Sequence, residues 1–409
     1  MKIFIKTYGC RVNQVESEAL LEEFLAQGHE ITQDFKEANL CFINTCSVTS
    51  NADKEAEKFI RTLLKQNSSA QIIVSGCFAR VKKDYLLQKY PTLKIYFKED
   101  LSKALFNKEI DWSVKEHAGH SRAFIKIQDG CDCFCSYCIV PYTRPIKTSK
   151  PKEIVLSEIK NLLANGYSEI VLTGINIGNY SCPKTKANLA DLCKEIFALK
   201  ESNFRVRFSS IEINTISDDL IDVLSKAGEK FCSYLHLPLQ SGSTKVLKDM
   251  RRHYTAEEFL ARLNYIRTKI KDFFVYTDII AGFPTETEQD FKISAEFLKK
   301  AKFAGLHVFS YSAREGTPAA KMPQLAPQVI KERSLILHKL DKELRAAAAQ
   351  SLKGQILQVI GEDFQDSYLR ATASNFQRVL IKTNQKPQGL FTVRVEECIG
   401  EDVFCSLIK

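Results

Sequence analysis

Strand-like and helix-like segments alternate along most of the chain, and this alternation restricts the fold more than any other feature. Short apolar runs separated by helical periodicity fill the region from residue 121 to residue 310. They are Ala123–Ile127, Glu169–Thr173, Arg205–Ser209, Tyr234–Leu239, Phe274–Ile280 and Leu306–Ser310. Such alternation predicts a parallel sheet. Six repeats predict a partial (β/α)6 barrel, with its functional groups at the carboxyl ends of the strands.

The N-terminal part repeats another pattern, an apolar run that ends on a cysteine and is followed by a helix-like stretch. The runs are Ile3–Cys10 (IFIKTYGC), Leu40–Cys46 (LCFINTC) and Ile72–Cys77 (IIVSGC). This pattern predicts a parallel α/β domain in which the three cysteines converge at one edge of the sheet. Taken alone, the trio is better explained as core residues, because a cysteine that ends a buried strand is often just a small apolar residue.

The C-terminal part changes character after a long helical stretch, about Gln328–Leu352. About 60 residues of short alternating runs follow, which predict a small all-β barrel. The segment around 107–119 is the best linker between the first two domains. The predicted fold class is therefore α/β with a small all-β domain at the end, and the domains are 1–112, 120–345 and 346–409.

Composition narrows the function classes. A chain of 409 residues has room for two or three domains, and no apolar run approaches the roughly 18–20 residues that a membrane span needs. Without a secretory signal the expected location is the cytoplasm, where thirteen cysteines indicate metal or redox chemistry rather than disulfides. The charge balance, 58 − 49 = +9, permits a polyanionic partner without requiring one.

Cys131, Cys135 and Cys138 form a C-x3-C-x2-C set directly after the first predicted barrel strand. Three thiolates on one short loop can hold three irons of a 4Fe-4S cluster and leave the fourth iron open to another molecule. Zinc is the weaker alternative because a structural zinc site needs four ligands, and Cys133 lies between the others on a tight loop. The chain has no H-E-x-x-H pattern, so a mononuclear metal hydrolase is not supported.

The cysteine spacing and the six-strand pattern behind it resemble the radical S-adenosylmethionine (SAM) superfamily, and the whole motif series is similar to the methylthiotransferases. The resemblance runs from Lys2 to about Ala320 and continues through a C-terminal barrel similar to a TRAM domain. The motifs, in order, are TYGCRVNQVESE, NTCSVT, SGCFAR, QDGCDCFCSYCIVPYTR, LTGINIGNY, RFSSIE, HLPLQSGS, DIIAGFPTETE and FSYSAREGTPA.

The resemblance implies two 4Fe-4S clusters with SAM as methyl donor and radical source. Cys131, Cys135 and Cys138 would hold the cluster that binds SAM, and the N-terminal cysteines would hold an auxiliary cluster from which sulfur is delivered. The clusters carry the chemistry, so no acid or base residue is assigned. The cofactor contacts expected by position are Tyr137, Thr173, Gly174, Glu212 and Gln240, although Glu212 and Gln240 are also consistent with polar residues that satisfy loop backbone.

The opening motif looks most like the branch that acts on N6-threonylcarbamoyladenosine (t6A) in tRNA, placing a methylthio group at adenine C2 beside the anticodon. The alternatives are N6-isopentenyladenosine, a ribosomal-protein aspartate, and a non-catalytic iron–sulfur RNA-binding protein. The implied partners are the tRNA anticodon stem-loop, an electron donor such as flavodoxin or ferredoxin, and a sulfur donor, but neither DNA nor a membrane.

Contacts with RNA phosphates are expected from basic residues that follow barrel motifs, although such residues often form only a solvated surface. The candidates are Arg144, Lys147, Arg251 and Arg252. The C-terminal barrel has no net charge, so RNA binding there would need aromatic side chains such as Tyr368 and Phe376. Departures from the family pattern are Cys133, Pro145 and Thr285, where asparagine, glycine and glycine are usual.

Overall fold

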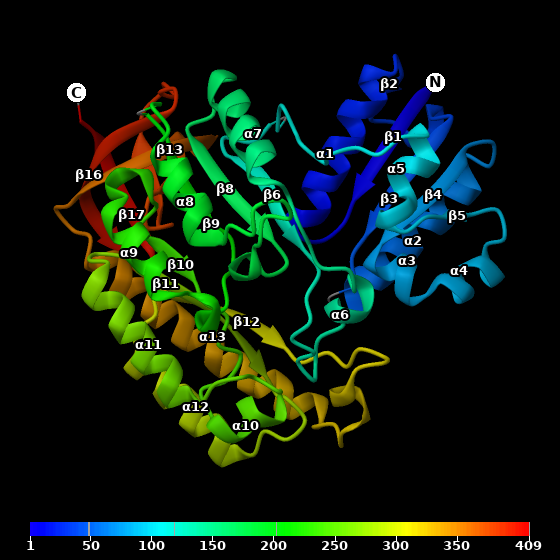
Figure 1. Ribbon diagram of the computed structural model, residues 1–409. Helices are drawn as coiled ribbons and strands as arrows, with labels where there is room; N and C mark the ends of the chain where they lie inside the picture. Colours follow the sequence, from blue (N-terminus) through cyan, green and yellow to red (C-terminus); the bar gives the residue numbers. More distant parts are fainter. Residues whose placement is uncertain (48–49, 118, 202, 409) are drawn as a thin grey trace.

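The computed structural model describes residues 1–47, 50–117, 119–201 and 203–408. Within them, a five-stranded parallel sheet in the order β2-β1-β3-β4-β5 forms the N-terminal part, drawn in blue in Figure 1. Its strands are β1 (Lys2–Thr7), β2 (Glu30–Ile31), β3 (Leu40–Thr45), β4 (Gln71–Gly76) and β5 (Lys94–Ile95). The strand order reverses between β1 and β3. In parallel sheets the carboxyl ends of the strands at such a reversal form a crevice for ligands.

Helices cover both faces of this sheet. They are α1 (Arg11–Ala26), α2 (Ser50–Gln66), α3 (Cys77–Val81), α4 (Lys83–Lys89) and α5 (Lys98–Phe106). Alternate residues of β3 face opposite sides: Phe42 packs with α1 and α5, whereas Ile43 packs with α2. Because both faces are covered, every residue of β3 is buried, and its first four residues, LCFI, form a continuous apolar run.

The central part of the chain is a partial barrel of parallel strands. Within the described residues these are β6 (Ala123–Asp129), β8 (Glu169–Gly174), β9 (Arg205–Phe208), β10 (Tyr234–His236), β11 (Phe274–Ala281) and β12 (Gly305–Ser310). Parallel bridges Val206–Phe231 and Ser210–His236 join the half that ends at β9 to the half that begins at β10. A short antiparallel strand, β7 (Thr148–Ser149), flanks β6. The six runs expected from the sequence are thus the barrel strands.

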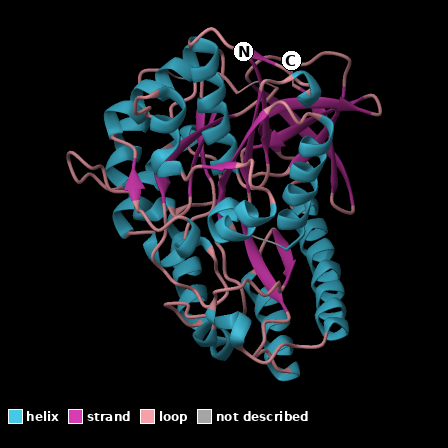
Figure 2. Ribbon diagram, turned by 90° about the vertical axis from the view of Figure 1, so that its right-hand side faces the viewer, coloured by secondary structure: helices cyan, strands magenta, loops and turns pink. Residues whose placement is uncertain are grey.

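The barrel helices lie outside these strands and share one apolar core with them. They are α7 (Lys152–Ala164), α8 (Leu189–Phe197), α9 (Asp218–Lys226), α10 (Thr244–Asp249), α11 (Ala256–Lys269) and α12 (Glu288–Ala301). A short helix, α6 (Val140–Thr143), follows the loop that carries Cys131, Cys135 and Cys138, the second cysteine group. In the view turned by 90°, helices flank the strands on both sides of the molecule (Figure 2).

Helix α1 packs against the inner face of the barrel wall. Its Val15 and Ala19 contact Phe124 of β6 and Val171 of β8, while neighbouring strand residues such as Ile125 face the barrel helices. Figure 1 shows α1 between the N-terminal sheet and β6. The N-terminal part is therefore anchored to the barrel through the helix that begins directly after Cys10.

The C-terminal part begins with the long helix α13 (Pro327–Gln350) and closes into a barrel in the order β13-β14-β15-β17-β16. Its strands are β13 (Ile356–Gln365), β14 (Tyr368–Ala373), β15 (Arg378–Lys382), β16 (Leu390–Ile399) and β17 (Asp402–Leu407). The fold class expected from the sequence is confirmed. Among the described residues, no helix is both long and apolar enough to cross a membrane.

Candidate functional site

The cysteine trio Cys10, Cys46 and Cys77 follows β1, β3 and β4, which are paired neighbours in the sheet and end at the same edge. Cys46 and Cys77 are buried, whereas Cys10 is exposed. Backbone packing here is so tight that a Cβ on Gly9 would lie 2.6 Å from Cys46 Sγ. The structure therefore brings the trio together at the crevice edge, as the sequence pattern predicts.

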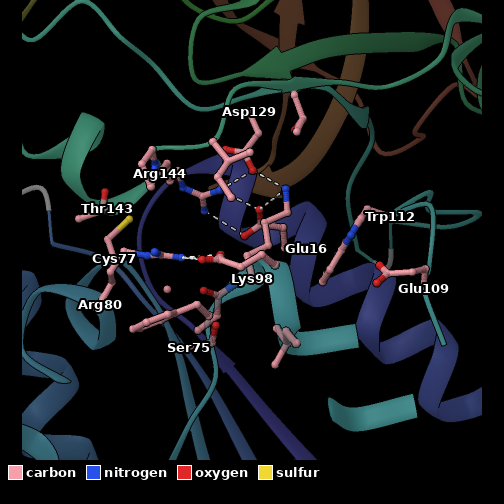
Figure 3. Close-up of a pocket in the computed structure, with 18 residues that line it drawn as sticks. Glu16, Ser75, Cys77, Arg80, Lys98, Glu109, Trp112, Asp129, Thr143 and Arg144 are labelled. Atoms are coloured by element: carbon pink, nitrogen blue, oxygen red, sulfur yellow. Dashed lines mark hydrogen bonds and ion pairs between the residues drawn. The ribbon is translucent and has the colours of Figure 1, made fainter. Parts of the chain in front are cut away.

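A cluster of largely buried charges lies beside the trio. We call it the charge cluster, and its members are Glu16, Lys98, Lys126, Asp129 and Arg144. Figure 3 shows Arg144 between Asp129 and Glu16, in a cavity of about 290 Å³ that Cys77 also lines. Three cations outnumber two carboxylates, so the surroundings favour an anionic group at the trio. The pKa of the Cys10 thiol is nevertheless raised, because desolvation of the sulfur outweighs the lowering by Arg144.

The second cysteine group, Cys131, Cys135 and Cys138, lies on the loop after β6, at the carboxyl end of the barrel. Ser136 fixes this loop, because its backbone N donates to Met250 O (2.9 Å) and its Oγ donates to Asp249 O (2.8 Å). The thiols lie within electrostatic reach of one another: a hydrogen bond from Cys133 lowers the pKa of Cys131 to about 7, whereas burial raises the pKa of Cys138 to about 12.

Two buried polar atoms without a hydrogen-bond partner lie beside this loop. Among the described residues, Asn176 Oδ1 and Ser209 Oγ are buried without a hydrogen-bond partner. Buried polar atoms in native proteins are normally hydrogen-bonded. These two lie just past the ends of β8 and β9, close to Thr173 and Gly174, and Asn176 Nδ2 is 3.8 Å from Cys133 Sγ. Each atom is thus free to form a hydrogen bond with a bound group.

Glu212 and Gln240, which the sequence suggests as cofactor contacts, both have partners within the protein. Both oxygens of Glu212 accept from Arg252, which also donates to Cys135 Sγ at 3.6 Å. Gln240 is buried in a left-handed backbone conformation (φ 75°), and its backbone N donates to Asp278 O. Tyr137 packs beneath the loop with neighbouring apolar residues of α10. Of these residues, Arg252 presents a cation directly to the second cysteine group.

Two of the four basic residues expected on the RNA surface are not on the surface. Arg144 is buried within the charge cluster, and the Arg252 side chain is buried against Glu212. The expectation that Arg144 and Arg252 contact phosphates is therefore wrong, because their guanidinium groups already have carboxylate partners inside the protein. Lys147 and Arg251 are exposed, and Lys147 pairs with the equally exposed Asp132.

The aromatic side chains of the C-terminal barrel also divide into two kinds. Phe376 packs between the two barrels, with its ring 4.6 Å from Tyr234 and 5.8 Å from Tyr276, so it is an interface residue rather than an RNA contact. Tyr368 packs edge-on against Phe404 and lines a groove between the C-terminal barrel and the central part, which His307 of β12 and Arg345 of α13 also line.

Further polar residues face the interior of the central barrel. His236 Nε2 lies 2.8 Å from Asp278 Oδ1, and the His236 and His307 rings stack with centroids 5.0 Å apart. The sequence places His236 directly before a Leu-Pro-Leu-Gln turn but does not indicate its partners. The available signal is periodicity, since Asp278 and His307 alternate with apolar residues along β11 and β12.

The same kind of signal could have revealed the charge cluster. Lys126 and Asp129 are charged residues in a fully buried strand, AFIKIQD, and Glu16 lies on a helix face with buried Asn13. A charged residue in a buried strand needs a partner from elsewhere in the fold. Only the tertiary structure identifies that partner as the N-terminal helix.

The fold and these two cysteine sites define a radical SAM enzyme with a second cysteine site on an N-terminal α/β domain. Comparison with known families agrees: residues 2–98 match "Uncharacterized protein family UPF0004" and residues 125–298 match the "Radical SAM superfamily". A solved structure of the radical SAM methyltransferase TsrM from Kitasatospora setae is similar in fold. Its TM-score is 0.59 at 13% identity, over 78% of this chain and 77% of that one.

Two curated relatives are similar over most of their length. The threonylcarbamoyladenosine tRNA methylthiotransferase MtaB of Bacillus subtilis (strain 168) is 35% identical, covering 94% of this chain and 91% of the relative. The tRNA-2-methylthio-N(6)-dimethylallyladenosine synthase of Geobacillus kaustophilus (strain HTA426) is also 35% identical, covering 88% and 73%. The chain belongs to the radical SAM tRNA methylthiotransferase family.

Members of this family use SAM and two 4Fe-4S clusters, and the site fits them. Both cysteine groups offer three thiolates at the carboxyl ends of parallel strands, and unpartnered polar atoms lie beside the second group. In the described part of the chain, no three Cys, His, Asp or Glu side chains could hold a single metal ion. A cubane cluster does not need such a group, because each cysteine binds a different iron.

Proposed function

We propose that this protein places a methylthio group at C2 of N6-threonylcarbamoyladenosine, next to the anticodon of tRNA. The proposal rests on the Bacillus subtilis relative, whose name specifies threonylcarbamoyladenosine. This chain and that relative match over nearly the whole length of both. That match spans 94% of this chain and 91% of the relative.

In this proposal, Cys10, Cys46 and Cys77 hold the auxiliary cluster, and the 131–138 loop holds the cluster that binds SAM. When bound, these cofactors supply the radical and the sulfur that a C–S bond at an unreactive carbon requires. The chain's own residues set the distance and the orientation between the two cofactors. Asn176 and Ser209 offer polar atoms to SAM, and Arg252 offers a cation beside Cys135.

The target base must leave the anticodon loop to reach the barrel interior, which is easier from a single-stranded loop than from a duplex. Exposed Lys147 and Arg251 are the phosphate contacts that we retain. An electron donor such as flavodoxin or ferredoxin and a sulfur donor complete the reaction in the cytoplasm. We assign residues 1–112 to the auxiliary cluster, 120–345 to SAM and 346–409 to RNA.

Nucleoside analysis of tRNA tests the substrate. A strain that lacks this gene should contain t6A without its 2-methylthio form. The wild-type gene should restore the 2-methylthio form, whereas a Cys135→Ala variant should not, because it loses a thiolate of the second cysteine group. Restoration of 2-methylthio-N6-dimethylallyladenosine instead would transfer the assignment to the sister substrate, which the equal identity of the Geobacillus relative favours as second candidate.

Iron analysis, together with SAM cleavage, separates this enzyme from a ribosomal-protein methylthiotransferase and from a non-catalytic RNA-binding protein. After anaerobic reconstitution, we expect about eight irons per chain in the wild type and about four in Cys10→Ala/Cys46→Ala/Cys77→Ala. About four irons in both proteins would contradict the auxiliary cluster. Release of 5′-deoxyadenosine with an unchanged tRNA profile would point to a ribosomal-protein substrate. No SAM cleavage would point to the non-catalytic protein.

A further inference from the structure

Arg144 connects the two cysteine sites through one guanidinium group. It follows α6, the short helix after Cys138, and it is buried. Its Nη1 donates to Glu16 Oε1 (2.8 Å) and to Asp129 Oδ1 (2.9 Å), and its Nη2 donates to Glu16 Oε2 (2.9 Å) and Asn13 Oδ1 (2.7 Å). A planar fork of fixed geometry can hold three partners in this way, whereas a single ammonium cannot.

On the N-terminal side, Asn13 transmits this contact to the trio. Its Nδ2 donates to Tyr8 O (2.9 Å) and Thr45 O (3.1 Å), the carbonyls that lie two residues before Cys10 and one residue before Cys46. A single amide therefore holds the ends of both strands that carry these cysteines.

On the barrel side, Asp129 transmits the contact to the second cysteine group. Its Oδ1 accepts from the backbone N of Gly130, at 2.8 Å, and Cys131 follows directly. Gly130 has a positive φ of 75°, and a Cβ there would lie 2.7 Å from the Ile146 carbonyl carbon. The start of the cysteine loop is thus fixed on one side by Asp129 and on the other by the chain after Arg144.

We propose that Arg144 is a positioning residue that sets the separation and orientation of the two cluster sites. The inference rests on the proposed function, because it requires a cluster at each cysteine group. Its physical basis is that one rigid guanidinium spans the hydrogen-bonded path between the loops, from Asn13 to Asp129. Small displacements of reacting groups reduce rates strongly, so the loss of this link should impair sulfur transfer more than either site by itself.

Arg144 can be substituted without unfolding the protein, because the rest of the charge cluster stays balanced. If Arg144 is replaced by glutamine, Glu16 and Asp129 still face Lys98 and Lys126, so two carboxylates remain matched by two cations. Arg144→Lys provides a second variant that keeps the charge but not the fork. Arg262→Gln is the control, because Arg262 pairs with Asp218 on the outer helices of the barrel and does not contact the path.

The experiment compares these variants after anaerobic reconstitution with SAM and reductant. Arg144→Gln and Arg144→Lys should keep about eight irons and near wild-type 5′-deoxyadenosine release. Their methylthio product per 5′-deoxyadenosine should fall by about tenfold to a hundredfold. The magnetic coupling between the two reduced clusters, measured by electron paramagnetic resonance, should change in both, and Arg262→Gln should match the wild type in every readout.

Unchanged magnetic coupling and an unchanged product ratio would overturn the inference. Loss of about four irons in both Arg144 variants would also overturn it, because Arg144 would then support one site rather than set the spacing of two. If the wild-type protein holds only about four irons per chain, both the proposed function and this inference are contradicted. If the wild type holds both clusters but makes no methylthio nucleoside, the magnetic coupling alone decides for or against Arg144.

Discussion

Gly9 shows how a single residue shapes the auxiliary site. Its φ of 95° belongs to a region that residues with a Cβ rarely adopt, and the space beside it is filled by the Cys46 side chain. Cys10 and Cys46 come from different strands, and the missing Cβ is what allows them to approach. The glycine before Cys10 is therefore as necessary for the trio as the cysteines are.

We predict that Gly9→Ala displaces Cys46 and loses the auxiliary cluster. Iron per reconstituted chain should fall from about eight to about four, with 5′-deoxyadenosine release retained because the second cysteine group is untouched. Gly28→Ala is the control: Gly28 also has a positive φ, but a Cβ there would meet nothing within 4 Å. Full iron content in Gly9→Ala would show that the crevice edge can relax by more than we expect.

At the scale of elements, α1 is the part that joins the N-terminal sheet to the barrel. It presents Leu20 and Phe24 to the sheet and Val15 and Ala19 to β6 and β8. A helix that is apolar on two sides must be covered on two sides. The Phe124 ring of β6 fills this contact, and the Arg11 guanidinium lies 4.6 Å from the ring centroid.

We predict that Phe124→Ala loosens this joint, at a cost of about 3–5 kcal/mol in the free energy of unfolding. Denaturant titration should show the loss, and limited proteolysis should cut faster in the 107–117 segment between the two parts. Phe124→Leu, which keeps most of the volume, should stay close to the wild type in both measurements. Equal proteolysis of all three proteins would mean that α1 is held to the barrel by other contacts.

For the molecule as a whole, a buried ion cluster joins the central and C-terminal barrels. Glu169 is fully buried between Arg205 and Arg207, and both arginines also donate to backbone carbonyls of the C-terminal barrel, such as Gln358 O at 2.8 Å and Ala373 O at 3.0 Å. The two arginines keep their counter-charge only if Glu169 stays ionised. The C-terminal barrel is thus attached through an acid-sensitive contact.

Burial raises the pKa of Glu169, but the opposing effect of Arg207 and Arg205 is larger. The pKa is therefore lowered to about 2, against an ordinary value of 4.5. Because the folded-state pKa is depressed, this contact stabilises the protein fully above pH 4.5 and loses its effect as the pH falls towards 2. The difference corresponds to at most about 3 kcal/mol.

We therefore predict that Glu169→Gln is less stable than the wild type at neutral pH, by about 3–5 kcal/mol, because two buried arginines lose their counter-charge. The gap should narrow between pH 4.5 and pH 2, as seen by denaturant titration at each pH. The exposed pair Lys292–Glu288 gives the control, since Glu288→Gln should change stability by less than about 1 kcal/mol. A gap that does not vary with pH would contradict the assigned pKa shift.

The local sequence pattern is sufficient to predict the barrel strands and to predict that Cys10, Cys46 and Cys77 lie close together. Strand–helix alternation is a short-range property, and parallel pairing then places strand ends at one edge whatever the connecting helices contain. Short strands are harder to predict: β15 and β17 of the C-terminal barrel do not stand out in the sequence, because their runs are brief and lie among polar residues. Their burial comes from barrel closure, which is a long-range event.

The family, the parallel architecture and the cysteine groups can be predicted from the sequence, because each depends on residue types at fixed spacing. The roles of the charged residues become clear only in the folded protein. Arg144 and Arg252 look like surface cations in the sequence, but folding brings Glu16, Asp129 and Glu212 against them from distant segments. Whether a charge faces water or a buried partner depends on contacts more than a hundred residues apart in the case of Glu16 and Arg144, and no local pattern encodes such a contact.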